Sequence, residues 1–304
     1  MSTRTALPVA ALLIALGAAA CTGGAAPSIA PGSPATGASG EPSPLASPVQ
    51  EGITHPTGAD EVVLRLESAG GFVPVEFIAG GLPYFTLYGD GRVVFQQTTV
   101  EPPMREDGVW AGYPLRTAVL SEDQVQDLLE FALADGGLAV ARDEYNNPLV
   151  ADAPTSVFTI NAEDDSKTVS VVALGMDGEP GPDTAVLRQL NALGERLRDF
   201  DQGGTLASEP YEAAAYRGVI LEQQGLQGVN TIAWPWDDIT PEDFTMPADP
   251  NALQQGTYTL TPDQAAAVGV EGFENGIMTG VYLKAPDGKT YSLVIRPLLP
   301  DEDA

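Results

Sequence analysis

The residues with the clearest chemical signature are two tryptophans, Trp234 and Trp236, which flank Pro235 and precede Asp237 and Asp238. Proline fixes its own φ and biases the preceding residue toward extended backbone, in which side chains two apart point the same way. The spacing predicts a rigid two-ring platform beside two carboxylates, suited to stacking on a sugar ring or a partner's side chain. The stronger interpretation is that both rings fill the core beneath a loop, because tryptophan is usually buried and its burial energy is large.

An acidic cluster continues from this stretch, since Glu242 and Asp243 follow a few residues later. Carboxylates could supply oxygens to Ca²⁺, which takes about six to eight of them. Thr240-Pro241 in front of these acids is typical of a helix start, with a capping residue, a first-turn proline and acids that match the helix dipole. Capping is the stronger interpretation, and we expect no metal and no cofactor.

Other catalytic chemistry is limited by scarce residue types. The chain has one histidine, His55, and one cysteine, Cys21. A zinc site of His and Cys ligands is excluded on this composition, and so is Ser-His-Asp or Cys-His catalysis, because we place His55 in a linker. No P-loop and no glycine-rich dinucleotide motif is present. Only chemistry based on carboxylates is left open.

The N-terminus has the pattern of an export signal. Arg4 precedes an apolar or small-residue run from Ala6 to Ala20, which is short of the about 20 residues that span a bilayer. The run leads into Cys21 and resembles the lipobox of bacterial lipoproteins, although Ala18 stands where that pattern usually has leucine. The lipobox implies that residues 1–20 are a signal peptide and that Cys21 is lipidated, with diacylglycerol and palmitate. The predicted location is the extracytoplasmic face of the cell membrane.

Residues 21–60 differ in composition from the rest of the chain. They are rich in Gly, Ala, Pro and Ser and lack aromatic side chains, so they predict a disordered tether. From Glu61 onward, alternating apolar residues predict a strand with Val62, Leu64 and Leu66 on one face and Val63 and Arg65 on the other. Hairpins are predicted over 84–97, 156–174 and 281–294, and helices from Ser121, Pro182 and Thr261.

Part of this plan recurs along the chain. LSEDQ at 120–124 is followed by LTPDQ at 260–264, and each capped helix precedes a strand-turn-strand unit. We favour a degenerate repeat over chance recurrence, because two motifs recur in the same order. The predicted fold is α+β, with antiparallel β-hairpins, two or three helices packed on one face, and two similar lobes at 61–202 and 208–300.

The net charge of −28 limits the kinds of molecule that the protein can bind. An acidic surface repels nucleic acid and anionic lipid headgroups, so we expect no nucleic acid and a membrane contact only through the N-terminal lipid. The acids otherwise serve solubility. The expected partner is a protein or glycan of the cell envelope.

Several segments together resemble an uncharacterised lipoprotein family of high-GC Gram-positive bacteria. They are LRLESAGGFVPVEF, YGDGRVVF, LSEDQ, VADAPTSVFTI and VYLKAPDGKTYSLVIRPLLP. The similarity extends over roughly Glu61 to Pro300. The resemblance implies the location and the extent of the folded part, and it implies no activity or ligand.

The leading functional hypothesis is a membrane-tethered, non-enzymatic binding or interaction module of the cell envelope. One alternative is an envelope glycan hydrolase that uses paired carboxylates, with its substrate stacked on Trp234 or Trp236. Another is a purely structural envelope component, which predicts buried Trp rings and no concave site.

Overall fold

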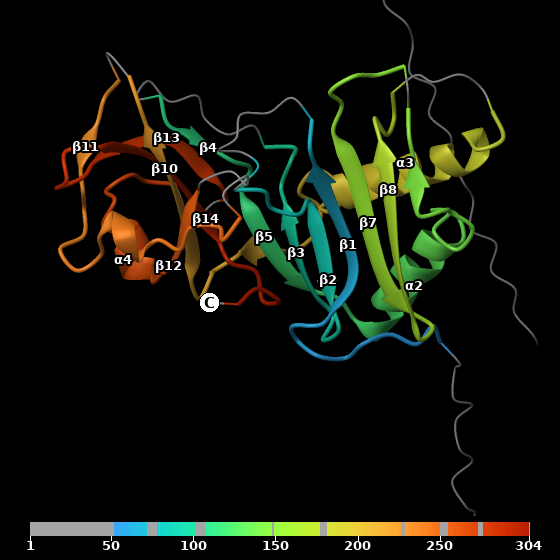
Figure 1. The fold of residues 1–304 in the computed structure, drawn as a ribbon. Helices are drawn as coiled ribbons and strands as arrows, with labels where there is room; N and C mark the ends of the chain where they lie inside the picture. Colours follow the sequence, from blue (N-terminus) through green and yellow to red (C-terminus); the bar gives the residue numbers. More distant parts are fainter. Residues whose placement is uncertain are drawn as a thin grey trace, which may run out of the picture. The chain divides into compact units, whose positions relative to one another are not determined.

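The computed structural model describes residues 52–71, 78, 80–100, 108–147, 149–176, 181–225, 229–249, 255–272 and 276–303. Within them the fold is a mixture of α and β dominated by antiparallel strands, with three α-helices (Figure 1). The predicted mixture of hairpins and a few helices is confirmed at this level.

The first sheet has eight strands, in the spatial order β6-β8-β7-β1-β2-β3-β5-β9. All neighbours are antiparallel except β6 and β8, which are parallel. The strands are β1 (Val62–Ala69), β2 (Phe85–Tyr88), β3 (Arg92–Gln96), β5 (Leu115–Val119), β6 (Glu144–Tyr145), β7 (Thr155–Ala162), β8 (Asp165–Val172) and β9 (Glu209–Pro210).

Helices α2 (Glu122–Leu133) and α3 (Thr184–Arg198) pack against this sheet. Helix α2 begins with the predicted capping box, in which Ser121 and Gln124 satisfy each other's backbone N–H groups. Apolar residues at helical spacing form the buried stripe of each helix. In α2 they are Val125, Leu128, Leu129 and Ala132, and in α3 they are Leu190, Leu193 and Leu197.

The hairpin turns follow from their residues. Between β2 and β3, Gly91 has a φ of 82°, which glycine adopts without a steric penalty, and the side chain of Asp90 accepts a hydrogen bond from Arg92 N. Between β7 and β8, Glu163 and Asp164 both have positive φ, as the twist of a two-residue hairpin requires.

The predicted alternation in β1 is wrong at its start. The register shifts between Val62 and Leu64, so that Val63 joins Leu64 and Leu66 in the helix-covered core. Val62 packs instead against a small cluster around Tyr88. A shift of one residue moves side chains to the other face, and a local irregularity of this kind is not visible in apolar spacing.

The second sheet has six strands, five of them in the order β11-β13-β14-β10-β12, with β4 paired to β13. The strands are β4 (Trp110–Ala111), β10 (Tyr216–Gln223), β11 (Ile232–Ala233), β12 (Gly256–Leu260), β13 (Met278–Lys284) and β14 (Thr290–Pro297). The predicted cap at Thr261 starts only a short helix, α4 (Pro262–Ala266), and the one at Thr240 starts a 3₁₀ turn, η1 (Pro241–Asp243).

Two short strands cross the predicted division into 61–202 and 208–300. Strand β4 lies in the first range and pairs with β13, and β9 lies in the second range and pairs with β5. Residues 51–304 form one compact unit by their contacts. Each sheet is therefore completed by a segment from the other range.

The predicted tether extends too far along the chain. Residues 52–60 pack on the first sheet and on α2: the amide of Gln126 bonds to both backbone groups of Ile53, and Ile53 contacts the core. His55 is not in a free linker, since its ring bonds to Pro56 O and to Glu122. Contacts with residues far along the chain, among them Gln126, Glu122 and Arg92, hold this segment, so its composition alone did not reveal it.

Candidate binding site

The tryptophan pair lies in the core beneath the second sheet. Trp236 is 6% exposed and donates its Nε1–H to Gln264 O at 2.8 Å, while half-buried Trp234 donates to Ile239 O at 2.6 Å. The two rings meet edge to face, with centroids 5.2 Å apart and an interplanar angle of 82°. Phe244 and Tyr291 complete the aromatic cluster.

This geometry differs from the two-ring platform that the spacing predicted. Both indole N–H groups are used within the protein, and the rings pack on each other rather than side by side toward a ligand. Asp237 and Asp238 are exposed. Asp243 accepts bonds from the N–H and hydroxyl of Thr240, which lower the pKa of its carboxyl group. The four acids therefore belong to loop and cap structure, as the capping interpretation expected.

Cys21, the predicted lipidation site, lies outside the described residues. No helix in the described part of the chain combines the length and apolar character needed to cross a bilayer. Within the same residues, no three His, Cys, Asp or Glu side chains are placed to hold a metal ion.

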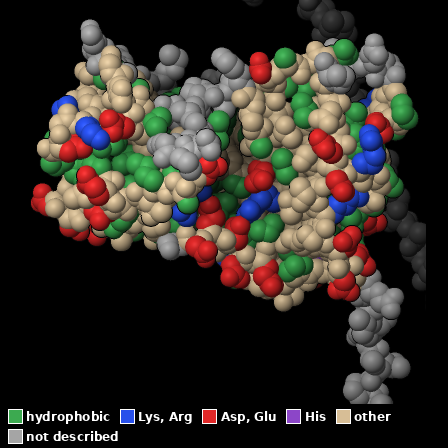
Figure 2. All heavy atoms as spheres, in the orientation of Figure 1, with side chains coloured by type: hydrophobic (Ala, Val, Ile, Leu, Met, Phe, Trp, Pro, Cys, Tyr) green, Lys and Arg blue, Asp and Glu red, His purple; other side chains and the backbone are tan. Residues whose placement is uncertain are grey.

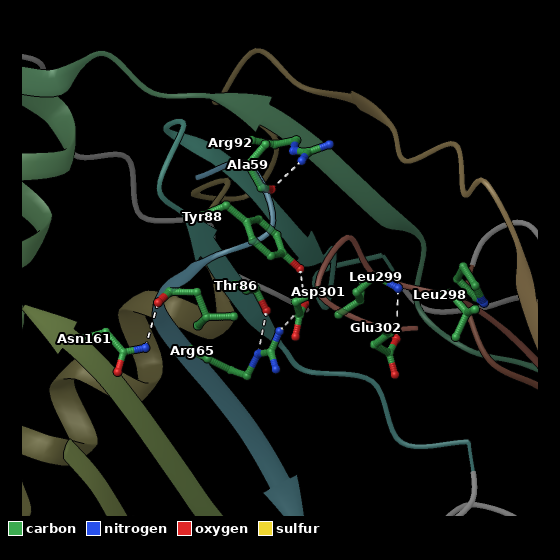
Figure 3. Close-up of polar contacts among 12 residues, drawn as sticks. Ala59, Arg65, Thr86, Tyr88, Arg92, Asn161, Leu298, Leu299, Asp301 and Glu302 are labelled. Carbon is green, nitrogen blue, oxygen red and sulfur yellow. Dashed lines mark hydrogen bonds and ion pairs between the residues drawn. The ribbon is translucent and has the colours of Figure 1, made fainter. Parts of the chain in front are cut away.

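A buried polar network centres on Asp301, close to the C-terminus, and reaches the first sheet (Figure 3). Asp301 Oδ1 accepts hydrogen bonds from Arg65 Nη2 and from Tyr88 Oη, each at 2.7 Å. Arg65 Nε also donates to Thr86 Oγ1 at 3.2 Å. The network therefore joins β1 and β2 to a residue that follows the last strand of the second sheet.

Burial and charge act together on these groups. Burial raises the pKa of Tyr88, and its hydrogen bond to Asp301 raises the pKa further, so the phenol stays protonated and donating. Burial alone would raise the pKa of Glu302, but hydrogen bonds and charge from Arg296, with the N–H of Leu299, bring it below the usual value. At neutral pH the phenol of Tyr88 is therefore protonated and the carboxyl group of Glu302 is ionised, and in these states both side chains form the bonds that hold the C-terminal segment.

A pocket of about 640 Å³ opens beside this network, over β3, β5 and β9. Its polar and aromatic lining comes from Arg92, Thr117, Ser208, Glu209, Tyr211 and Glu212, and its apolar lining includes Val119. Two further pockets lie near β8 and are lined mainly by acids and small polar residues. Their acids are Glu61, Asp164 and Asp165 in one, and Asp143, Glu144 and Asp165 in the other.

The pocket over β3, β5 and β9, here called the Arg92 pocket, is built by strand register. Arg92 lies opposite Val119 in the β3–β5 pair, and Thr117 follows the same face two residues away. Arg92 Nη2 donates to Ala59 O at 2.7 Å, and Asp90 lies 3.8 Å from the same nitrogen. About a third of the Arg92 side chain stays exposed (31%), and Nη2 is the nitrogen that bonds to Ala59 O, whereas Nε is buried without a partner.

Arg116 fixes Ser208, which also lines the pocket. Its Nη2 donates to Ser208 O, and its Nε donates to Ser208 Oγ at 3.2 Å. Ser208 therefore accepts with its hydroxyl oxygen and keeps the hydroxyl proton to donate. Tyr211 is held by a hydrogen bond from its Oη to Leu298 O at 2.8 Å, and burial raises its pKa to about 12.

No sequence motif predicts the Arg92 pocket. Its lining comes from three segments, β3, β5 and residues 207–212, which have no motif in common. The one available hint is that Arg92 is among only 14 Lys and Arg residues, against 42 Asp and Glu.

The face of the molecule drawn in Figure 2 is acidic. Figure 2 shows acidic side chains spread across the face in view, with fewer Lys and Arg among them. No protein-family model, no curated protein and no solved structure matches the chain at a significant level. The resemblance to a lipoprotein family stays a prediction.

Proposed function

We propose that the protein is an exported lipoprotein whose folded part is a non-enzymatic binding module on the outer face of the cell membrane. The observation that carries the proposal is the N-terminal pattern, an apolar run that ends in small residues directly before Cys21. Lipidation also explains why an exported chain has a single cysteine. The partner is a component of the cell envelope.

The number of residues along the chain between Cys21 and the packed segment that begins at residue 52 supports a tethered arrangement. The composition of the roughly 30 residues between them is typical of a flexible linker, for which a mean span of about 30 Å is expected. The folded part would then work at a distance from the lipid surface. This suits a chain whose charge of −28 is repelled by anionic headgroups.

Binding is favoured over catalysis by the chemistry of the lining residues. The Arg92 pocket offers one cation, two hydroxyls, an aromatic ring and two carboxylates, and none of these is paired as a nucleophile with a base. The glycan hydrolase remains the second candidate, because Glu209 and Glu212 line one pocket. It predicts turnover of the bound glycan, whereas a binding module leaves the ligand intact.

We also propose that the two halves are degenerate copies of one α+β unit, in which a capped helix precedes a hairpin. In its support, the capping boxes at Ser121 and Thr261 both form, and each precedes an antiparallel hairpin further along the chain. In this view the second half has kept a reduced helix, since α4 has five residues and α2 has twelve. Helices covering one face of each sheet belong to the same proposal.

Replacing Cys21 with serine is expected to move the protein from the membrane pellet to the soluble fraction. Serine has no sulfur to carry the lipid, and a folded acidic protein has no other predicted anchor. The measurement is fractionation of cells labelled with a palmitate analogue. The neighbouring variant Thr22→Ala should keep both label and membrane position. An unlabelled wild type, or a labelled Cys21→Ser, would contradict the anchor.

A further inference from the structure

We propose that the Arg92 pocket binds a neutral saccharide, with one sugar ring seated over β3, β5 and β9. This inference rests on the proposed function as a binding module and names the chemical class of its ligand. The pocket volume of about 640 Å³ falls within the range of small-molecule sites, about 300 to 1,000 Å³.

The lining offers hydrogen-bond donors and acceptors together. Arg92 supplies donors only, Glu209 and Glu212 supply acceptors, and Ser208 has a hydroxyl proton left to donate. Thr117 uses its proton on Val93 O at 2.9 Å, so its oxygen is left to accept. A sugar hydroxyl both donates and accepts, so a ring bearing several of them matches this mixed set.

The charges disfavour the simpler ligands. A phosphate or carboxylate would gain from Arg92 but would meet Glu209 and Glu212 at the same pocket, within a chain of net charge −28. A cationic ligand would gain from Glu209 and Glu212 but would meet Arg92 in the same pocket. A neutral polyol uses the cation and both carboxylates as hydrogen-bond partners and brings no opposing charge.

The apolar lining fits the C–H faces of a sugar. Tyr211 and Val119 both line the pocket, and the Tyr211 ring is fixed by its bond to Leu298 O. An aromatic ring that is already held in place loses little side-chain entropy when a ligand packs on it. Val119 is 75% exposed, which leaves apolar surface at the pocket for a ligand to cover.

The test compares two substitutions at equally exposed valines. Val119→Trp fills the pocket, whereas Val140→Trp adds the same ring at a site outside it, where Val140 is 73% exposed. The full chain, purified in detergent, is titrated with glucose, galactose, mannose and N-acetylglucosamine, and separately with inorganic phosphate. Ligand-observed NMR reports binding, and circular dichroism checks that each variant is folded.

We expect at least one sugar to bind the wild type and Val140→Trp equally, and to bind folded Val119→Trp at least about tenfold more weakly. Glu212→Gln, at an exposed residue, should also weaken binding, because the amide accepts less strongly than a carboxylate. Binding of phosphate in place of sugar would overturn the proposal, and so would equal affinity of Val119→Trp or no sugar binding at all. Failure here leaves the palmitate label of Cys21 unaffected, so the two proposals fail separately.

Discussion

Replacing Trp236 with alanine is expected to lower the free energy of unfolding by about 3 to 5 kcal/mol, the usual cost of removing a large buried aromatic side chain. Trp236 is 6% exposed and packs against Trp234 and Phe244. The substitution also leaves Gln264 O without the indole N–H that it accepts at 2.8 Å. Urea denaturation followed by far-ultraviolet circular dichroism measures the change.

The controls for this prediction are the adjacent acids. Asp237→Ala and Asp238→Ala should each change stability by less than about 0.5 kcal/mol, because both side chains are exposed. A loss below about 1 kcal/mol for Trp236→Ala would mean that the ring is not part of the core. The ligand-binding platform that the sequence suggested would then return as the better interpretation of the pair.

Asp301→Ala is expected to destabilise the protein by about 2 to 4 kcal/mol, because it leaves a largely buried cation and a buried hydroxyl without their acceptor. The side chain of Arg65 is 17% exposed, and Tyr88 is fully buried. The effect should appear in thermal unfolding of the full chain at neutral pH. Tyr88→Phe removes the hydroxyl without leaving a buried charge unpaired, so its cost should be smaller, about 1 kcal/mol.

Asp303 provides the matched control for Asp301. It lies two residues further along, is exposed, and takes part through its backbone oxygen, which accepts from Arg217 at 3.0 Å. Asp303→Ala should therefore leave the unfolding temperature almost unchanged. Equal effects of the two substitutions would show that the Asp301 side chain makes no specific stabilising contact, contrary to the geometry around it.

The features that sequence analysis predicted correctly depend on residues close together in the chain. The cap at Ser121 needs only Gln124, three residues on, and the turn at Asp90 and Gly91 needs only the φ preference of glycine. The apolar stripe of α3 likewise depends on spacing within one helix. Local energies decide these features, so the sequence is sufficient to find them.

The features that it missed depend on residues far apart. Ile53 is fixed by Gln126, 73 residues away, and Arg65 by Asp301, 236 residues away. The orientation of Trp234 and Trp236 depends on Phe244 and on Gln264 of the short helix α4. A two-residue spacing fixes the direction of side chains only in extended backbone, and beyond β11 tertiary packing decides it instead.

The candidate site belongs to the same group. Arg92, Thr117 and Ser208 meet only after β3, β5 and β9 have paired in register. The sequence points instead to Trp234 and Trp236, because two closely spaced tryptophans are compatible with packing in the core and with binding. Neither candidate site depends on the predicted cellular location, which is inferred separately from the N-terminal signal.

Lysine labelling in intact cells of the native host shows whether the protein is an envelope module on the outer face of the membrane. A membrane-impermeant amine reagent is applied before lysis, and the isolated protein is analysed by mass spectrometry. Lys284 and Lys289 are exposed and should be labelled in intact cells, whereas a cytoplasmic protein in the same sample should stay unlabelled. Labelling of both lysines only after the cells are broken would place the folded part inside the cell and contradict the proposed location.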